Sequence, residues 1–487
     1  MRAAWLALAL LSCKVANELY CDGTTTCPAG FRCNLDPGPT QNGCVPIGAD
    51  GGAPDVPVVD AGPPDAIGCP DAGACPAELP ICRGGVCTPC AGNLECPITA
   101  PVCSTSGCGA CGNSSECMDR DKTKQCHLPD GTCVECRNDS QDCTTAAAPV
   151  CDNTVCRGCR KDAECADICD TDTGRCVPTD DILYVSMGGT GTACTQSAPC
   201  GSIVTAVAKV TATQWIELLP GTYVESFVVK DKTVQMVGLS ATVQPSGADP
   251  VVWVQGSGVL LMRNVRVRGD DAHTGDGIRC NGTVGATLRG SDLVISDNVG
   301  FGVNVSNCTF QLERSRLLRN RGGGVRLVDT TFVVRNNFIA QNGTLDQSSV
   351  GGFRLLSAPT GASTFDFNTV TGNRSKSDTA PGVQCDAALA TSSNIVWGNG
   401  SVANAPGQIA GSCTFTFSDL GGPAPQTSPN INEDPSFHDA GGDDYHLGMG
   451  SKCANAGQAG TGTTDDIDGD PRPKPGGAPD IGADEAF

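Results

Sequence analysis

The feature that most limits the fold is a short apolar strand that recurs through residues 293–399 and ends each time at an asparagine. Its first copy reads Leu-Val-Ile-Ser-Asp-Asn, and its last reads Ile-Val-Trp-Gly-Asn. A period of this length is typical of solenoids, in which each repeat forms one coil. The asparagines follow one another at intervals of 22, 22, 31 and 26 residues, at positions Asn298, Asn320, Asn342, Asn373 and Asn399.

The repeat predicts a mainly β protein with a right-handed parallel β-helix over residues 181–430. About eight coils fit at this period. We expect the asparagines to form structural ladders between coils rather than a binding row, since Asn tolerates the left-handed conformation at a tight bend. The low aromatic content of 4% suits thin stacked layers. A short helix over residues 202–210 is predicted to cap the first coil, whose strand edges would otherwise stay open.

Cysteines crowd the other part of the chain, where 25 of the 32 lie at or before Cys176. They fall into quartets, one within residues 13–45 and five within residues 69–180, with a period of 21 to 25 residues. Units this small bury little apolar surface, so two disulfides per quartet would supply the missing stability. Each quartet allows three connectivities, and the sequence does not choose between them.

Each junction between quartets forms a CxxC pair such as Cys87/Cys90, which is also a zinc-ligand spacing. An even count, an export signal and the split of each pair between two repeats favour disulfides instead. A redox role would require a βαβ pattern around the pair, and none surrounds it. Among the later cysteines Cys453 stays unassigned, and the predicted pairs are Cys194–Cys200, Cys280–Cys308 and Cys385–Cys413.

The first residues read as an export signal. Residues 1–12 hold one basic residue and an apolar run too short to span a membrane. The run ends Leu-Leu-Ser-Cys, which resembles a bacterial lipobox and predicts a lipid on Cys13; ordinary cleavage near Ala16 is the alternative. Lys14 after that cysteine indicates the outer membrane, by resemblance to the bacterial sorting rule. We expect an extracytoplasmic, lipid-anchored protein on the cell surface or outer membrane.

Composition limits the partners. Residues 46–68 are Pro, Gly, Asp and Ala almost throughout and are predicted to form an extended linker. The net charge of -21 argues against nucleic acid, because phosphate binding needs clustered Lys and Arg. It argues equally against an anionic membrane surface, so the only membrane contact expected is the N-terminal lipid.

Two parts of the sequence resemble those of known bacterial surface proteins. The cysteine array resembles the repeats of large bacterial surface lipoproteins, which implies a stalk or interaction module. Residues 431–487 resemble the tail of bacterial β-helix surface proteins of the choice-of-anchor type, which implies a segment that closes the last coils. The motifs that carry the second resemblance are Asp434-Pro-Ser-Phe, Tyr445-His-Leu, Asp466-Ile-Asp-Gly-Asp-Pro-Arg and Asp480-Ile-Gly-Ala-Asp-Glu.

Candidate chemistry is sparse. Glycoside hydrolysis needs two carboxylates that flank the bond, and the best group of residues is Asp270, Asp271, His273, Asp276 and Arg279. The alternative for this group is an acidic turn between coils. The tail also resembles a calcium loop, because hard cations take several oxygen ligands; its candidate ligands are Asp466, Asp468 and Asp470. Calcium is the one cofactor that the sequence suggests.

The sequence therefore predicts a surface-displayed, non-enzymatic lipoprotein for adhesion, glycan binding or envelope scaffolding. Its expected partner is a polysaccharide or surface glycan. The alternative is a polysaccharide lyase or glycoside hydrolase of the pectin-lyase-like β-helix superfamily. Fold alone does not separate the two, since function depends on the site.

Overall fold

The computed structural model describes residues 31–34, 43–46, 75–76, 78–137, 140–283, 285–346, 350–376, 381–401, 408–422, 429–460 and 462–486. The predicted signal peptide, the lipidation residue Cys13 and the predicted linker, apart from Pro46, lie outside these residues. The chain divides into two units, Met1–Cys90 and Ala91–Phe487. No helix among the described residues is long and apolar enough to cross a membrane.

The described residues of the first unit form two antiparallel hairpins. Strand β1 (Phe31–Asn34) pairs with β2 (Gly43–Pro46), and β3 (Ile81–Arg83) pairs with β4 (Val86–Thr88). A disulfide joins Cys75 to Cys87 beside the second hairpin.

The second unit begins with four cysteine modules, each built from a single 3₁₀ turn and a hairpin. The bounds are η2 (Asn93–Glu95) with β5 (Val102–Ser104) and β6 (Gly107–Gly109); η3 (Ser114–Glu116) with β7 (Gln125–His127) and β8 (Thr132–Val134); η4 (Ser140–Asp142) with β9 (Val150–Asp152) and β10 (Val155–Arg157); and η5 (Asp162–Glu164) with β11 (Cys169–Asp170) and β12 (Arg175–Cys176).

Disulfides hold these modules, as the cysteine pattern predicts. In the last three modules the first cysteine of the quartet bonds the third, and the second bonds the fourth, which resolves the open connectivity. The pairs are Cys111–Cys126 with Cys117–Cys133, Cys136–Cys151 with Cys143–Cys156, and Cys159–Cys169 with Cys165–Cys176. Disulfides in this number are typical of an oxidising compartment.

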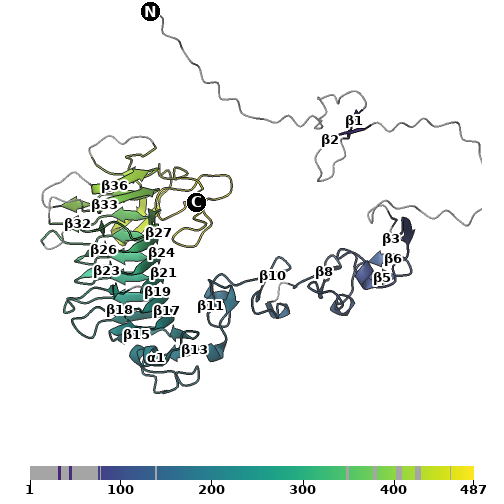
Figure 1. Cartoon of the computed structure of the whole chain (residues 1–487), viewed down its shortest axis with the longest axis horizontal. Coiled ribbons are helices and arrows are strands. Elements are labelled where there is room, and N and C mark those ends of the chain that lie inside the picture. Colours follow the sequence, from purple (N-terminus) through teal and green to yellow (C-terminus); the bar gives the residue numbers. More distant parts are fainter. Residues whose placement is uncertain are drawn as a thin grey trace, which may run out of the picture. The chain divides into compact units, whose positions relative to one another are not determined.

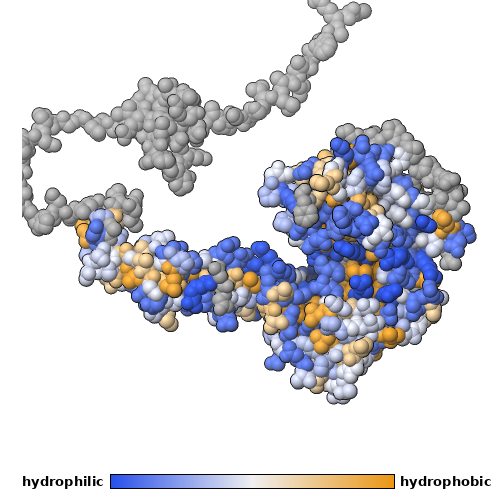
Figure 2. Space-filling model, turned by 180° about the vertical axis from the view of Figure 1, so that it is seen from behind, coloured by the Kyte–Doolittle hydropathy of each residue, from blue (hydrophilic) through white to orange (hydrophobic). Residues whose placement is uncertain are grey.

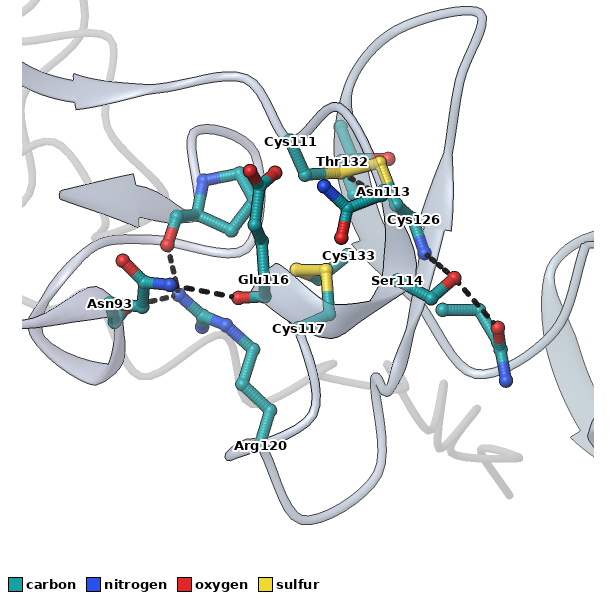
Figure 3. The surroundings of a disulfide bond; sticks show 12 residues. Asn93, Cys111, Asn113, Ser114, Glu116, Cys117, Arg120, Cys126, Thr132 and Cys133 are labelled. Carbon is teal, nitrogen blue, oxygen red and sulfur yellow. Dashed lines mark hydrogen bonds between the residues drawn. A yellow bond between two sulfur atoms is a disulfide. The ribbon is translucent and has the colours of Figure 1, made fainter. Parts of the chain in front are cut away.

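An acidic residue directly before the second cysteine closes the turn in each of the four modules. Its carboxylate accepts the backbone N–H of the residue that follows the first cysteine, as Glu116 does from Gly112 at 2.7 Å. The same bond recurs from Ala91 to Glu95, from Arg137 to Asp142 and from Arg160 to Glu164. Neighbouring modules are also bonded: in Figure 3, Asn93 donates to the carbonyl of Glu116, and Arg120 donates to that of Asn93.

The rest of the second unit is a parallel β-helix, so the predicted fold class is confirmed. Its strands stack on three faces, A, B and C (Figure 1). Face A is an eight-stranded sheet of β16 (Phe227–Lys230), β18 (Val252–Gly256), β20 (Ile278–Gly282), β23 (Phe301–Ser306), β26 (Gly323–Val328), β29 (Phe353–Leu355), β33 (Val383–Ser392) and β36 (Ile409–Thr416).

Faces B and C share the long strands β17 (Thr233–Gln244) and β19 (Val259–Arg268), which run through both. Face B continues as β21 (Thr287–Ser291), β24 (Thr309–Glu313), β27 (Thr331–Arg335) and β30 (Thr364–Asp366). Face C continues as β22 (Val294–Ser296), β25 (Arg316–Leu318), β28 (Phe338–Ala340), β31 (Thr369–Thr371), β34 (Ile395–Trp397) and β37 (Asp419–Leu420). A further short pair joins β32 (Arg374–Ser375) to β35 (Gly400–Ser401).

The first coil is covered by the predicted helix. Helix α1 (Ile203–Lys209) begins after Ser202, whose hydroxyl accepts the N–H of Thr205 at 3.3 Å. Ile203, Ala206 and Val207 are buried in the same apolar core as the coils. The chain enters this coil through η6 (Thr179–Asp181), β13 (Ile182–Val185), β14 (Trp215–Leu218) and β15 (Gly221–Val224).

The predicted asparagine ladder is present. The side chain of Asn320 accepts a hydrogen bond from that of Asn298 at 2.8 Å and donates one to Asn342 at 2.9 Å, and Asn373 and Asn399 extend the row. The left-handed conformation expected of these asparagines belongs instead to the residue before each of them: Asp297, Arg319, Gln341, Gly372 and Gly398.

Glycines at or beside the start of the following strands make room for this ladder. A Cβ atom at Gly302 would lie 2.7 Å from the Nδ2 atom of Asn320, and one at Gly382 would lie 2.9 Å from that of Asn399. Close approach, rather than a left-handed backbone, therefore requires glycine here. A second ladder, which the sequence reading missed, joins Asn337, Asn368 and Asn394 at 3.0 and 3.2 Å.

Disulfides also join neighbouring coils, at Cys280–Cys308 and Cys385–Cys413, and Cys194–Cys200 closes the loop before helix α1. These are the same pairs that the sequence predicts. Cys453 is free and buried, and its thiol donates to Asp419 at 3.2 Å.

The tail lies along face C rather than only at the last coils (Figure 1). It contains β38 (Phe437–Asp439), η7 (Ala440–Gly442) and β39 (Asp444–Leu447). Tyr445 packs against Phe338 of β28, and Ile481 packs against Ile395 of β34. The outer side of face C is thereby buried against the tail.

Candidate functional site

The first three candidate catalytic residues lie in the turn between β19 and β20. Asp270 accepts the backbone N–H groups of Ala272 and His273 at 2.9 and 2.8 Å. Asp271 forms an exposed ion pair with Arg321. The imidazole of His273 is buried, with its Nε2 atom 2.5 Å from the carbonyl oxygen of Asp249. These contacts stabilise the turn, which fits the alternative of an acidic turn between coils.

Asp276 and Arg279 form a separate group on face A. Asp276 is 3% exposed, and its Oδ1 atom accepts the N–H of Phe301 at 2.8 Å. Its Oδ2 atom accepts from Arg279 at 2.8 Å and from Asn304 at 2.9 Å. Both carboxylate oxygens are therefore engaged within the protein. The structure brings Asp276 and Arg279 together, but Asp276 orients its neighbours instead of presenting a free acid.

Arg279 belongs to a row of outward-facing side chains that crosses face A, one per coil. Parallel pairing sets these residues in register from β18 to β33, where strands lie about 4.8 Å apart. Each is half-buried, with the alternate residues of the same strands in the core. We call this row the polar column; its members are Trp253, Arg279, Asn304, Arg326, Arg354 and Gln384.

Contacts run along the polar column. The guanidinium of Arg279 lies over the Trp253 ring, 5.8 Å from its centroid. Arg326 donates to Asn304 at 3.1 Å. At the other end Arg354 and Gln384 both contact the carboxylate of Asp386, at 3.3 and 2.7 Å. The side chains are thus oriented by one another.

The middle of the column carries an excess of positive charge. No carboxylate among the described residues forms an ion pair with Arg326. Burial lowers the pKa of Arg326, as do the charges of Arg354 and Arg279, while the charge of Asp276 opposes the shift. The Trp253 Nε1 and Gln384 Oε1 atoms are buried without a hydrogen-bond partner. In a chain of net charge -21, this row suits a ligand with carboxylate and hydroxyl groups.

A cleft of about 1180 Å³ lies where the last cysteine module, face B and the tail loop 464–471 meet. On the face shown in Figure 2, hydrophilic residues cover much of the β-helix, and the cysteine modules show a mixture of hydrophilic and hydrophobic residues. Three of the arginines that line this cleft form ion pairs that join its walls, so we favour the polar column as the ligand site. These pairs are Arg263–Asp162, Arg289–Asp172 and Arg314–Asp465.

The candidate calcium ligands of the tail have different partners. Asp466 is buried and accepts three backbone N–H groups, from Asp468, Asp470 and Glu485. Asp468 bonds the Nε2 atom of His446 at 2.7 Å. The Asp470 side chain is exposed. Asp466 therefore closes the loop through its carboxylate, and calcium binding stays a prediction.

Comparison with known proteins adds little on activity. Residues 93–182 match the model of a family of unknown function, DUF8331, which covers the four cysteine modules of the second unit. No curated protein matches the sequence. The crystal structure of pectate lyase Pel9A is similar over 63% of this chain and 96% of that chain, with 15% identity and a TM-score of 0.37. A likeness of this size carries no argument about substrate or catalysis.

Proposed function

We propose that the protein is displayed on the cell surface by a lipid on Cys13 and binds acidic glycans through the polar column. The observation that carries the proposal is the alignment of Arg279, Arg326 and Arg354 beside Trp253. Arginine forms bidentate hydrogen bonds with carboxylates, and an indole ring offers a stacking face. A regular polymer can repeat its contacts from coil to coil.

The geometry favours binding over hydrolysis. Hydrolysis of a glycosidic bond needs two carboxylates on either side of it. On this face the Asp276 carboxylate is buried and bonded at both oxygens, and Asp386 contacts Arg354 and Gln384. Neither is offered as a free acid or base.

The test uses the full chain with its disulfides intact, titrated with polygalacturonate and alginate as acidic polymers and dextran as the neutral one. We expect binding to the acidic polymers that weakens with salt. The Arg326→Ala variant should bind about tenfold more weakly, which is the loss of one charged hydrogen bond. Arg266→Ala, an exposed arginine on the outer side of β19, is the matched control and should bind as the parent does.

New chain ends are measured in the same samples. If the parent cleaves the polymer and Arg326→Ala does not, the lyase or hydrolase alternative is correct and the binding proposal is wrong. Equal binding by Arg326→Ala and the parent would remove the polar column as the site. Membrane anchoring is tested separately, since Cys13→Ser should release the protein from the membrane fraction.

A further inference from the structure

We propose that His446, Asp468 and Asp484 form a site for a divalent metal ion of the zinc class. One side-chain donor from each of these residues lies within 4.8 Å of the other two. Imidazole together with carboxylates suits zinc better than calcium, which prefers an all-oxygen shell. Three protein donors would leave a fourth position for water, as in zinc sites that stay open. This inference is independent of glycan binding by the polar column.

His446 is held in the orientation that a ligand requires. Its Nδ1 atom contacts the Asp444 carboxylate, which leaves Nε2 directed toward Asp468 at 2.7 Å. The ring also packs edge-on against Phe338, with the centroids 5.2 Å apart. A carboxylate on the far nitrogen is the arrangement that fixes metal-bound histidines. Metal binding would displace the proton on Nε2 to solvent.

The charge around Asp484 is a second and separate reason. This carboxylate is 7% exposed and accepts the N–H of Leu447 at 2.7 Å. No basic side chain among the described residues forms an ion pair with it. Its neighbours in the site are the His446 imidazole and the Asp468 carboxylate, whose donor atoms lie within 4.8 Å of it. A buried carboxylate without a cation is costly, and a divalent ion would offset that cost.

The neighbouring arginines do not form ion pairs with Asp484. The Arg316 guanidinium lies 3.6 Å from Asp468 and over the Phe338 ring, and it pairs with neither Asp484 nor Asp444. The Arg472 guanidinium pairs with Glu485 instead. The site is also accessible, since Asp468 is half-exposed and lines the cleft beside face B. An ion could therefore enter from solvent.

The experiment titrates the chelator-treated full chain, with disulfides intact, with zinc chloride and then with calcium chloride in a calorimeter. We expect a zinc site of unit stoichiometry and much weaker calcium binding. Asp444→Asn removes the partner that orients His446 and should lower zinc affinity about 10–100-fold. His446→Gln and Asp468→Asn each remove a ligand and should lower zinc affinity by more than that. Asp470→Asn makes the same charge change in the same loop and should bind zinc as the parent does.

The results separate the alternatives. Zinc binding that survives both His446→Gln and Asp468→Asn would place the ion elsewhere and overturn the proposal, as would no binding at all. Calcium affinity equal to that of zinc would overturn the assignment to the zinc class. If His446→Gln does not fold, Asp468→Asn decides the question, because the Asp468 side chain is half-exposed and lies outside the core.

Discussion

The guanidinium of Arg472 and the carboxylate of Glu485 form an ion pair that is almost completely buried beneath the tail, with an Nε–Oε2 distance of 3.1 Å. Arg472 also donates to the carbonyl of Gly482 at 2.9 Å and to Asn336 of the coils at 3.2 Å. Its charge lies over the Phe367 ring, 4.6 Å from the centroid. Arg472 thus links the last residues of the tail to the β-helix.

Replacing Arg472 by Met should destabilise the second unit by about 3–5 kcal/mol, because Glu485 would stay buried without a cation. Urea unfolding followed by circular dichroism measures the loss. Arg374→Met removes an exposed arginine and should change the free energy of unfolding by less than about 0.5 kcal/mol. Similar losses in the two variants would contradict a central role for this ion pair.

Asn342 lies in the middle of the first ladder. Its Nδ2 atom donates to the carbonyl of Leu317 at 2.9 Å and to Asn373 at 3.0 Å, and its Oδ1 atom accepts from Asn320. Asn342→Ala should cost at least about 3 kcal/mol in urea unfolding, since several buried groups lose partners together. Asn432→Ala, at an exposed asparagine, should cost far less. A loss below that of Asn432→Ala would show that the ladder is dispensable.

Periodicity made the fold predictable. The asparagine series and the alternating strands give the coil length directly, and quartets of cysteines give the modules. The second ladder was missed because only its three middle positions, Asn337, Asn368 and Asn394, are asparagine. Serine occupies the position at each end of the row: Ser315 accepts a hydrogen bond from Leu293, and Ser418 accepts one from Asn394. The acid before each second cysteine, such as Glu164, was a visible signal that the sequence reading did not use.

The candidate sites were harder to predict because they depend on register. Arg279, Arg326 and Arg354 are separated by tens of residues, and only the pairing of β20, β23, β26 and β29 sets them in one row. The tail motifs were recognised, but the contact between His446 and Asp468 depends on how loop 464–471 folds back onto β39. Motif spacing alone does not give that contact.

Cys453 should be unreactive in the folded protein. Burial raises the pKa of its thiol, the Asp419 charge raises it further, and the thiolate is the reactive form. Iodoacetamide at pH 8 should leave the Cys453 peptide unlabelled in buffer and label it fully in urea, as read by mass spectrometry. Equal labelling in both conditions would mean that the tail opens readily from face C.

The last cysteine module covers Glu217 of β14, which is 2% exposed and has no hydrogen-bond partner at Oε2. Ile168 of the module packs with Tyr184 and Trp215 of the first coil. Nearby, Arg263 donates to Asp162 at 2.5 Å. Burial, together with the charges of Asp167 and Asp162, raises the pKa of Glu217 to about 7.

This pKa predicts how the docking of the module responds to pH. The folded state holds a proton on Glu217 that the unfolded chain releases near its ordinary pKa of 4.5. Stability from this group is therefore fully present below about pH 4.5 and declines until about pH 7. Glu217→Gln cannot ionise, so its stability relative to the parent should rise across that window by at most about 3 kcal/mol. Urea unfolding from pH 4 to pH 8 measures the difference. Glu433→Gln changes an exposed glutamate and is the control, so its stability relative to the parent should not vary with pH. If the relative stability of Glu217→Gln does not vary with pH either, this carboxylate does not govern the docking.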